Sequence, residues 1–250
     1  MAILQRSFGH RVEKEREGLW RIVFHFPTST NCWLLEDKGE LTLIDAGCFW
    51  NTGTIFDTIS SIDKPLRRIA ITHAHPDHAG AAGELARRTG AQVFAHQLDV
   101  PYLTGKRSLA ELEGSTLSHY LHRAAHHLGV LNPPSVDEPL PVEEADEIGS
   151  LKVIHTPGHT PGGVSFWSEK HKALFVGDNA SNRFSLLSIN MSVFTLARAQ
   201  LIESFEKYQE YDARLILPGH GRAHYSQQAS ADLLNSAQNV QRHHRRKISN

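Results

Sequence analysis

The sequence predicts an α/β fold in which short strands form two groups, each followed by helices. The first observation behind this prediction is periodicity. Runs rich in β-branched and aromatic residues alternate with helix-compatible segments on both sides of residue 100. The second observation is that histidines and acidic residues, framed by glycine or proline, recur where predicted strands end.

The first half of the chain supplies one group of strands and two helices. Strands are predicted at 20–26, 31–36, 41–45, 66–71 and 91–95. A hairpin turn at 37–40 joins the second and third of these strands, and a helix is predicted at 54–59. A longer helix is predicted at about 77–88, and Thr89-Gly90 ends it because glycine readily closes a helix.

The second half repeats this arrangement, with strands predicted at 151–155, 164–167, 173–176 and 215–217. The second and third of these strands pair across a turn, and the third ends at Gly177. The acidic stretch 136–150 is predicted to be a surface connection. An amphipathic helix is predicted at 198–208, and a terminal helix runs from Gln227 into the basic run 242–247. For that run, a disordered end is preferred over a contact with nucleic acid or an acidic surface.

We expect residues 1–250 to form one domain that contains a helical insertion at about 101–135. The insertion contains His119, His122, His126 and His127. The first three lie on one helical face, so a third metal site is one interpretation. A solvated helix face is preferred, because no acidic or sulfur ligand joins them. If the insertion lies over the cluster at His73–His78, it forms a wall or lid of the substrate pocket.

The composition narrows the class of protein. The chain has 250 residues, of which 40% are hydrophobic, and a formal net charge of -1, which argues against nucleic acid as the main partner. Its two cysteines, Cys32 and Cys48, are too few for a disulfide scaffold and are expected to be reduced. There is neither an apolar run of membrane-spanning length nor an N-terminal secretory signal. We therefore expect a soluble, cytoplasmic protein.

The densest chemical signal is the run Thr72-His73-Ala74-His75-Pro76-Asp77-His78, between a predicted strand and a predicted helix. In extended chain alternate side chains share one face, so His73 and His75 can point the same way. The turn at Pro76 lets Asp77 and His78 face the same point. Imidazole and carboxylate ligands suit zinc, and also iron, manganese or cobalt. A solvated turn with accidental histidines is the weaker interpretation.

Three further candidates follow later strands. His159 lies at the apex of the loop 156–163, Asp178 follows Gly177, and His220 lies in Pro218-Gly219-His220-Gly221. Glycine at such positions lets the backbone approach a bound ion or ligand closely. Each residue alone could be a structural one, but their repeated position at strand ends favours a shared site.

Two other residues at strand ends have open interpretations. Asp45 either orients a histidine ligand or caps the following turn. His96 could lie near the metals, but a histidine hydrogen-bonded to its neighbours is preferred.

In combination, these motifs resemble the metallo-β-lactamase superfamily. The matches, in the order of the family, are Thr72-His73-Ala74-His75-Pro76-Asp77-His78-Ala79-Gly80, Thr156-Pro157-Gly158-His159-Thr160-Pro161-Gly162, Gly177-Asp178 and Pro218-Gly219-His220-Gly221. The combination is specific for the superfamily but not for a substrate. The resemblance implies a four-layer αββα sandwich, with two mixed sheets between outer helices and the site at one edge.

The resemblance also implies two divalent metal ions. By match to the family motif, the first ion is held by His73, His75 and His159, the second by Asp77, His78 and His220, and Asp178 bridges them. Zinc is the first expectation, with iron or manganese as alternatives. The implied chemistry is hydrolysis by a metal-bound hydroxide shared between the ions. Asp77 is the catalytic residue that hydrogen-bonds the hydroxide and passes a proton to the leaving group.

Departures from the family pattern narrow the substrate. Asp178 stands where dedicated β-lactamases of this fold usually have cysteine or serine. The stretch 179–182 lacks the tyrosine that acyl-homoserine-lactone hydrolases often carry, and little chain follows His220 to bind glutathione as in glyoxalase II enzymes. We therefore expect a dinuclear metal-dependent hydrolase of a small ester, thioester or lactone. The alternatives are a phosphodiesterase and a non-catalytic metal-binding module. Neither the native metal nor the oligomeric state follows from the sequence.

Overall fold

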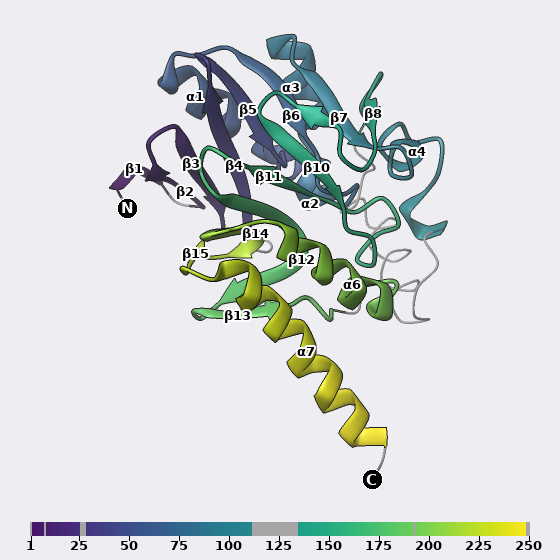
Figure 1. Cartoon of the computed structure of the whole chain (residues 1–250). Helices are drawn as coiled ribbons and strands as arrows, with labels where there is room; N and C mark the ends of the chain where they lie inside the picture. Colours follow the sequence, from purple (N-terminus) through teal and green to yellow (C-terminus); the bar gives the residue numbers. More distant parts are fainter. Residues whose placement is uncertain (1, 8, 26–28, 112–134, 193, 249–250) are drawn as a thin grey trace.

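The computed structural model describes residues 2–7, 9–25, 29–111, 135–192 and 194–248 (Figure 1). In this part of the chain, two mixed β-sheets pack face to face and helices cover the outer face of each. The expected four-layer αββα sandwich is therefore confirmed. The strand order is β1 to β8 in the first sheet and β15-β14-β12-β11-β10-β9 in the second, where β13 also pairs with β12.

The first sheet is antiparallel from β1 to β5 and parallel from β5 to β8. Its strands are β1 (Ala2–Ser7), β2 (His10–Arg16), β3 (Leu19–Phe24), β4 (Thr30–Asp37), β5 (Glu40–Ile44), β6 (Leu66–Ala70), β7 (Gln92–His96) and β8 (Leu140–Val142). Parallel neighbours need crossover connections. These contain η1 (Phe49–Asn51), α1 (Thr52–Ile62), α2 (Pro76–Ala79), α3 (Ala82–Thr89), α4 (Val100–Leu103) and η2 (Leu109–Glu111).

The second sheet is antiparallel except for the β12–β14 pair, which is parallel. Its strands are β9 (Glu147–Ile148), β10 (Leu151–His155), β11 (Val164–Ser168), β12 (Ala173–Arg183), β13 (Leu186–Ile189), β14 (Leu215–Gly221) and β15 (His224–Tyr225). Its outer face is covered by α6 (Arg198–Ser204), η3 (Phe205–Glu210) and α7 (Ala229–Ile248).

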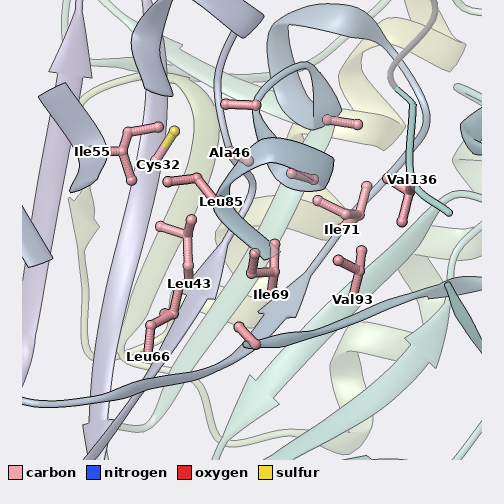
Figure 2. Close-up of a cluster of buried hydrophobic side chains, with 14 of the residues drawn as sticks. Cys32, Leu43, Ala46, Ile55, Leu66, Ile69, Ile71, Leu85, Val93 and Val136 are labelled. Carbon is pink, nitrogen blue, oxygen red and sulfur yellow. The ribbon is translucent and has the colours of Figure 1, made fainter. Parts of the chain in front are cut away.

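Three apolar layers hold the sandwich together. Figure 2 shows the first, between the first sheet and α1 and α3, where Ile55 and Leu85 meet Cys32. Along β4, Cys32 and Leu34 belong to this layer while Trp33 and Leu35 belong to the layer between the sheets. This alternation follows because successive side chains of a strand point to opposite faces. The third layer packs the second sheet against α6, η3 and α7.

The parallel strands determine where the loops lie. Because β5, β6 and β7 run in the same direction, the segments that follow them emerge at one edge of the first sheet. These segments contain Asp45, the His73–His78 run and Asp99. The second sheet contributes the loop after β10, the middle of β12 and the end of β14, which contains His220.

Several predicted boundaries are wrong. The helix predicted at 77–88 is divided at Gly80 and Ala81 into α2 and α3, where Gly80 lies close to the backbone of Cys48 and Phe49. The 198–208 helix is α6 followed by the 3₁₀ helix η3. The stretch 136–150 contains β8 and β9 rather than only a connection. Helix α7 continues through the basic run expected to be disordered.

The strands β12 and β14 also extend further than predicted, to Arg183 and Gly221. Asp178 and His220 therefore lie inside strands rather than after them. The reason is that the two strands pair with each other beyond Gly177, through register shifts that no local sequence pattern marks. The strands β1, β2, β13 and β15 were not predicted.

Other expectations have mixed outcomes. Cys32 and Cys48 are both free and buried, which confirms that they are not paired. None of the helices within the described ranges is long and apolar enough to cross a membrane. Residues 112–134, with the four histidines of the insertion, lie outside the described residues, so the proposed lid and the single-domain organisation stay predictions.

Candidate metal centre

The first candidate ligand group consists of His73, His75 and His159. His73 and His75 lie between β6 and α2, and His159 lies on the loop between β10 and β11. His75 Nδ1 is 3.0 Å from His73 Nε2 and 3.1 Å from His159 Nε2. All three side chains are buried, so three ring nitrogens converge on one small volume. One cation at that point can contact all three.

The second group consists of Asp77, His78 and His220. Asp77 and His78 belong to the first turn of α2, and His220 belongs to β14. Asp77 Oδ2 is 3.7 Å from Nε2 of both His78 and His220. The two histidines are buried, whereas 28% of the Asp77 side chain is exposed. This group therefore has one side that a small molecule can reach.

Asp178 connects the two groups. Its Oδ1 atom is 3.3 Å from His78 Nε2, and its Oδ2 atom is 3.1 Å from His220 Nε2 and 3.7 Å from His159 Nε2. One carboxylate thus touches histidines of both groups. All seven residues predicted from the sequence lie together at one site, although positions 73 and 220 are far apart in the chain.

Asp45 orients two histidine rings through their Nδ1 atoms, which point away from the centre. Its Oδ2 atom is 2.8 Å from His78 Nδ1 and accepts a hydrogen bond from the Thr72 hydroxyl, while its Oδ1 atom accepts one from the Thr72 backbone N–H. The Thr72 hydroxyl in turn lies 3.0 Å from His73 Nδ1. These partners place a proton on Nδ1 of both rings, so Nε2 is the nitrogen that each ring can offer to a metal ion at the centre. Of the two interpretations of Asp45, the orientation of a histidine is therefore the correct one.

Two more histidines are oriented in the same way. His159 Nδ1 lies 3.2 Å from the Thr195 hydroxyl, which donates to the backbone oxygen of Asn190 and can therefore accept from the ring. His220 Nδ1 donates to the backbone oxygen of Ser29, at 2.6 Å. Both rings again turn Nε2 toward the centre, as metal ligation requires.

Asp99 is a functional candidate that the sequence did not indicate. It is buried after β7, and it accepts hydrogen bonds from the backbone N–H of Ala74 and of Gly162 and from the Thr160 hydroxyl. It therefore joins the turn that contains His73 and His75 to the loop that contains His159. Burial raises the pKa of Asp99 to about 6, although its three hydrogen bonds oppose that shift. No motif surrounds Asp99, so only its three partners reveal the role.

The spacing of the site also depends on a glycine. A Cβ atom at Gly219 would lie 2.5 Å from Asp178 Oδ1 and 2.5 Å from His78 Cε1. Any side chain there would displace a residue of the centre. The same strand segment is anchored to the first sheet by Asn31, whose side-chain amide donates to the backbone oxygens of Pro218 and Gly221.

The electrostatics differ between the two groups. Burial lowers the pKa of His73 well below its usual value and that of His159 to about 4, so both rings are neutral. Burial favours the neutral form of His78 too, but Asp178, Asp77 and Asp45 together raise its pKa well above the usual value. His220 and His78 hold the pKa of Asp178 well below its usual range despite burial, so it remains an anion. A cation would satisfy these negative charges.

The donor set fits divalent metal ions. Among the described residues, His78 Nε2 and Asp178 Oδ1 are fully buried and have no hydrogen-bond partner. Buried polar atoms are rarely left in this state, so a partner such as an ion is expected between them. Imidazole nitrogens and carboxylate oxygens are ligands that zinc, iron and manganese accept.

His96 does not belong to this cluster, in agreement with the preferred interpretation that it is hydrogen-bonded to its neighbours. Its ring stacks on that of His155, with centroids 4.0 Å apart and planes at 10°, and its Nδ1 accepts from the backbone N–H of Leu98. Burial, and next the nearby His155, lower the pKa of His96 to about 4.

The fold and the site together define a class of protein, an αββα sandwich with clustered histidines and carboxylates where loops of both sheets meet. The sequence profile of the metallo-beta-lactamase superfamily matches residues 25–220, and the chain belongs to this superfamily. Relatives named as hydrolases bear out the expected enzyme class, a metal-dependent hydrolase.

The chain is similar to several curated proteins. It is 33% identical over 170 residues to the uncharacterized protein YobT of Bacillus subtilis, covering 65% of this chain and 67% of YobT. It is 30% identical over 155 residues to the probable metallo-hydrolase YflN of the same organism, covering 58% of this chain and 57% of YflN. It is 26% identical over 157 residues to the hydroxyacylglutathione hydrolase GloC of Haemophilus influenzae, covering 59% of this chain and 65% of GloC. The matches thus span about two thirds or less of these relatives' own lengths.

Solved structures share the fold. The structure of TTHA1623 in a di-iron-bound form has a TM-score of 0.63 at 25% identity and covers 80% of this chain and 91% of that one. The structure of TMB-1 has a TM-score of 0.68 at 17% identity and covers 93% of this chain and 99% of the TMB-1 chain. The likeness to TMB-1 shows the fold alone.

Proposed function

We propose that the chain is a dinuclear metal-dependent hydrolase that cleaves a small ester, thioester or lactone. His73, His75 and His159 would hold the first ion, Asp77, His78 and His220 the second, and Asp178 would lie between them. The observation that carries this proposal is the position of Asp178, whose two oxygens lie 3.1–3.3 Å from His220 and His78 and 3.7 Å from His159. Relatives named hydroxyacylglutathione hydrolase support an acyl compound as the substrate.

When bound, two divalent ions supply Lewis acidity, which lowers the pKa of a water molecule and polarises the acyl oxygen of the substrate. Zinc is proposed first, with iron and manganese as alternatives. The task of His73, His78, His159 and His220 is to present Nε2 lone pairs, which their hydrogen bonds at Nδ1 hold in place.

Asp77 is the proposed catalytic residue. Its side chain is more exposed than those of the buried histidines, and its Oδ2 atom accepts a hydrogen bond from the Thr30 hydroxyl at 3.4 Å. Asp77 takes a proton from the attacking water and passes it to the leaving oxygen or sulfur. The water oxygen bonds to the acyl carbon and the C–O or C–S bond breaks. The products are a carboxylic acid and an alcohol or thiol, joined in one molecule when the substrate is a lactone.

The reaction class is tested on protein reconstituted in parallel with zinc, iron or manganese, with metal content measured by elemental analysis. At equal metal loading we expect hydrolysis of p-nitrophenyl acetate and far slower cleavage of bis(p-nitrophenyl) phosphate. The reverse preference would support the phosphodiesterase instead. Absence of both activities in metal-loaded protein would favour the non-catalytic module. Extended chelation is expected to abolish turnover, and added metal to restore it.

The role of Asp178 is tested by Asp178→Ala, which should lower metal content and activity together. The exposed Asp57 on the outer helix α1 provides a matched control, because Asp57→Ala removes a carboxylate that belongs to neither ligand group. If the Asp178 variant keeps two ions or keeps its activity with one, Asp178 does not bridge the ions.

A further inference from the structure

Large apolar side chains are exposed directly beside the candidate metal centre. Phe49 is 52% exposed, Trp50 is 42% exposed and Phe194 is 38% exposed. Single exposed apolar residues are common on protein surfaces, but aromatic residues gathered around a polar site indicate a binding function. Their arrangement around the two ligand groups therefore bears on which substrate the site accepts.

Phe49 and Trp50 lie beside the second ligand group. They belong to η1, which follows β5 at the edge where the His73–His78 run follows the parallel strand β6. The backbone N–H of Ala46 donates to the backbone oxygen of His78 at 2.5 Å. A Cβ atom at Gly80 would lie only 2.7 Å from the backbone nitrogen of Phe49. The backbone that carries the aromatic pair therefore lies against α2, the helical turn that contains Asp77 and His78.

Phe194 lies beside the first ligand group. Its ring meets the His75 ring at an interplanar angle of 72°, with centroids 6.4 Å apart. The next residue, Thr195, holds His159 through its hydroxyl. Aromatic surface thus borders both ligand groups, with Phe49 and Trp50 at one and Phe194 at the other.

The Phe49–Trp50 pair is also preorganised. The two rings contact edge to face, with centroids 4.8 Å apart and planes at 76°, which is a favourable aromatic geometry. A surface whose rings are already ordered loses little conformational entropy when a ligand covers it. An apolar chain is the ligand that gains most from such a surface, because its methylene groups leave water.

We propose that the substrate has an apolar acyl chain of several carbons, which lies over Phe49 and Trp50 while its carbonyl group reaches the metal centre beside Phe194. This inference rests on the proposed function. It adds that the site discriminates by the length of the acyl chain, and that Phe49 and Trp50 determine this preference. Acyl groups without such a chain, such as acetyl, use only the polar part of the site.

The test compares the p-nitrophenyl esters of acetate, butyrate, hexanoate and octanoate on metal-loaded protein. Full burial of one methylene raises affinity about fourfold. The rings cover only one side of the acyl chain, so each added methylene is about half buried and should raise kcat/KM roughly twofold. Octanoate over acetate should then reach about 50-fold. In Trp50→Ser and Phe49→Ser this ratio should fall to below about tenfold.

Tyr225→Ser is the matched control. Tyr225 is 51% exposed but pairs with Leu215 at the start of β14, whereas His220 lies near the other end of that strand. Removing this ring should leave the octanoate-to-acetate ratio at the wild-type value. A ratio that falls as far in Tyr225→Ser as in Trp50→Ser would overturn the assignment of these residues.

A second readout does not depend on turnover. Of the four tryptophans only Trp50 is exposed, since Trp20, Trp33 and Trp167 are buried. Octanoate added to the metal-loaded protein should shift the tryptophan emission to shorter wavelength, and this shift should be absent in Trp50→Phe. Acetate should produce no shift in either protein.

The two proposals fail in different ways. If no ester of any length is hydrolysed, the proposed function is wrong. If the esters are hydrolysed but kcat/KM does not rise with chain length, or the rise survives in Trp50→Ser and Phe49→Ser, the reaction class stands and the apolar acyl chain is wrong.

Discussion

Replacing Asp45 by asparagine tests whether one carboxylate sets the proton positions of ligands in both groups. The substitution conserves size, and the backbone favours it, because Asp45 has a φ of 57°, where asparagine is readily accommodated. The asparagine oxygen can still accept from the Thr72 backbone N–H, as Asp45 Oδ1 does at 2.8 Å. Its NH₂ group, however, takes the place of Oδ2, which is 2.8 Å from His78 Nδ1.

That amide can only donate to His78 Nδ1, which must then lose its proton. The proton moves to Nε2, the atom that faces Asp178 at 3.3 Å, and removes the lone pair that a metal needs. The same NH₂ group also donates to the Thr72 hydroxyl, which then donates to His73 Nδ1 instead of accepting from it. The proton of His73 therefore also moves to Nε2. Loss of a partner of this kind typically weakens metal binding by about 10–100-fold. The stability of the metal-free protein should change by no more than about 1–2 kcal/mol, since the fold keeps its packing.

The assay is competition with a chromophoric chelator, which gives the dissociation constant of each ion, together with urea unfolding of the chelated protein. Asp45→Ala is the comparison, because it leaves the Thr72 and His78 donors without an acceptor and should cost about 2–4 kcal/mol of stability. Wild-type affinity for both ions in Asp45→Asn would refute the argument. Equal loss of stability in the two variants would show that Asp45 has only a structural role.

Three other predictions concern separate features. Gly219→Ala should reduce metal content, because the new methyl group would lie 2.5 Å from Asp178 Oδ1, whereas Gly53→Ala in α1 meets no atom within 4 Å and should leave it unchanged. Asp99→Ala should lower the free energy of unfolding by about 2–5 kcal/mol, measured in urea, because two backbone N–H groups and a hydroxyl lose their acceptor. His96→Asn should flatten the loss of stability in acid, because the pKa of His96 is lowered to about 4 in the folded protein.

The sign of the His96 effect follows from linkage. The unfolded chain binds a proton at His96 near pH 6.5, but the folded chain does so only near pH 4. Its contribution to stability is therefore complete above pH 6.5 and is lost as the pH falls toward 4. Urea unfolding at pH 7 and pH 5 should show a larger difference for wild type than for His96→Asn. An equal difference would contradict this account, as would normal metal content in Gly219→Ala or unchanged stability in Asp99→Ala.

The sequence alone indicated the seven candidate ligands that the structure places together. Four of them, His73, His75, Asp77 and His78, lie within six positions, so their local spacing brings them together. The glycines beside His159, Asp178 and His220 marked the other three, because close approach of backbone to a site requires a residue without a side chain. Runs rich in apolar and β-branched residues likewise predicted most strands of both sheets, since strands packed between two layers bury both faces.

The tertiary structure decided what depends on partners distant in the chain. Asp99 acquires its role from Ala74, Thr160 and Gly162, which are 25 to 63 positions away. Asp45 orients His78 only because β5 and β6 lie side by side. β12 and β14 extend past the boundaries predicted for them because they pair with each other. Hydrogen bonds between segments leave no periodic signal in either segment, so sequence spacing locates the ligands while the fold alone selects the residues that orient them.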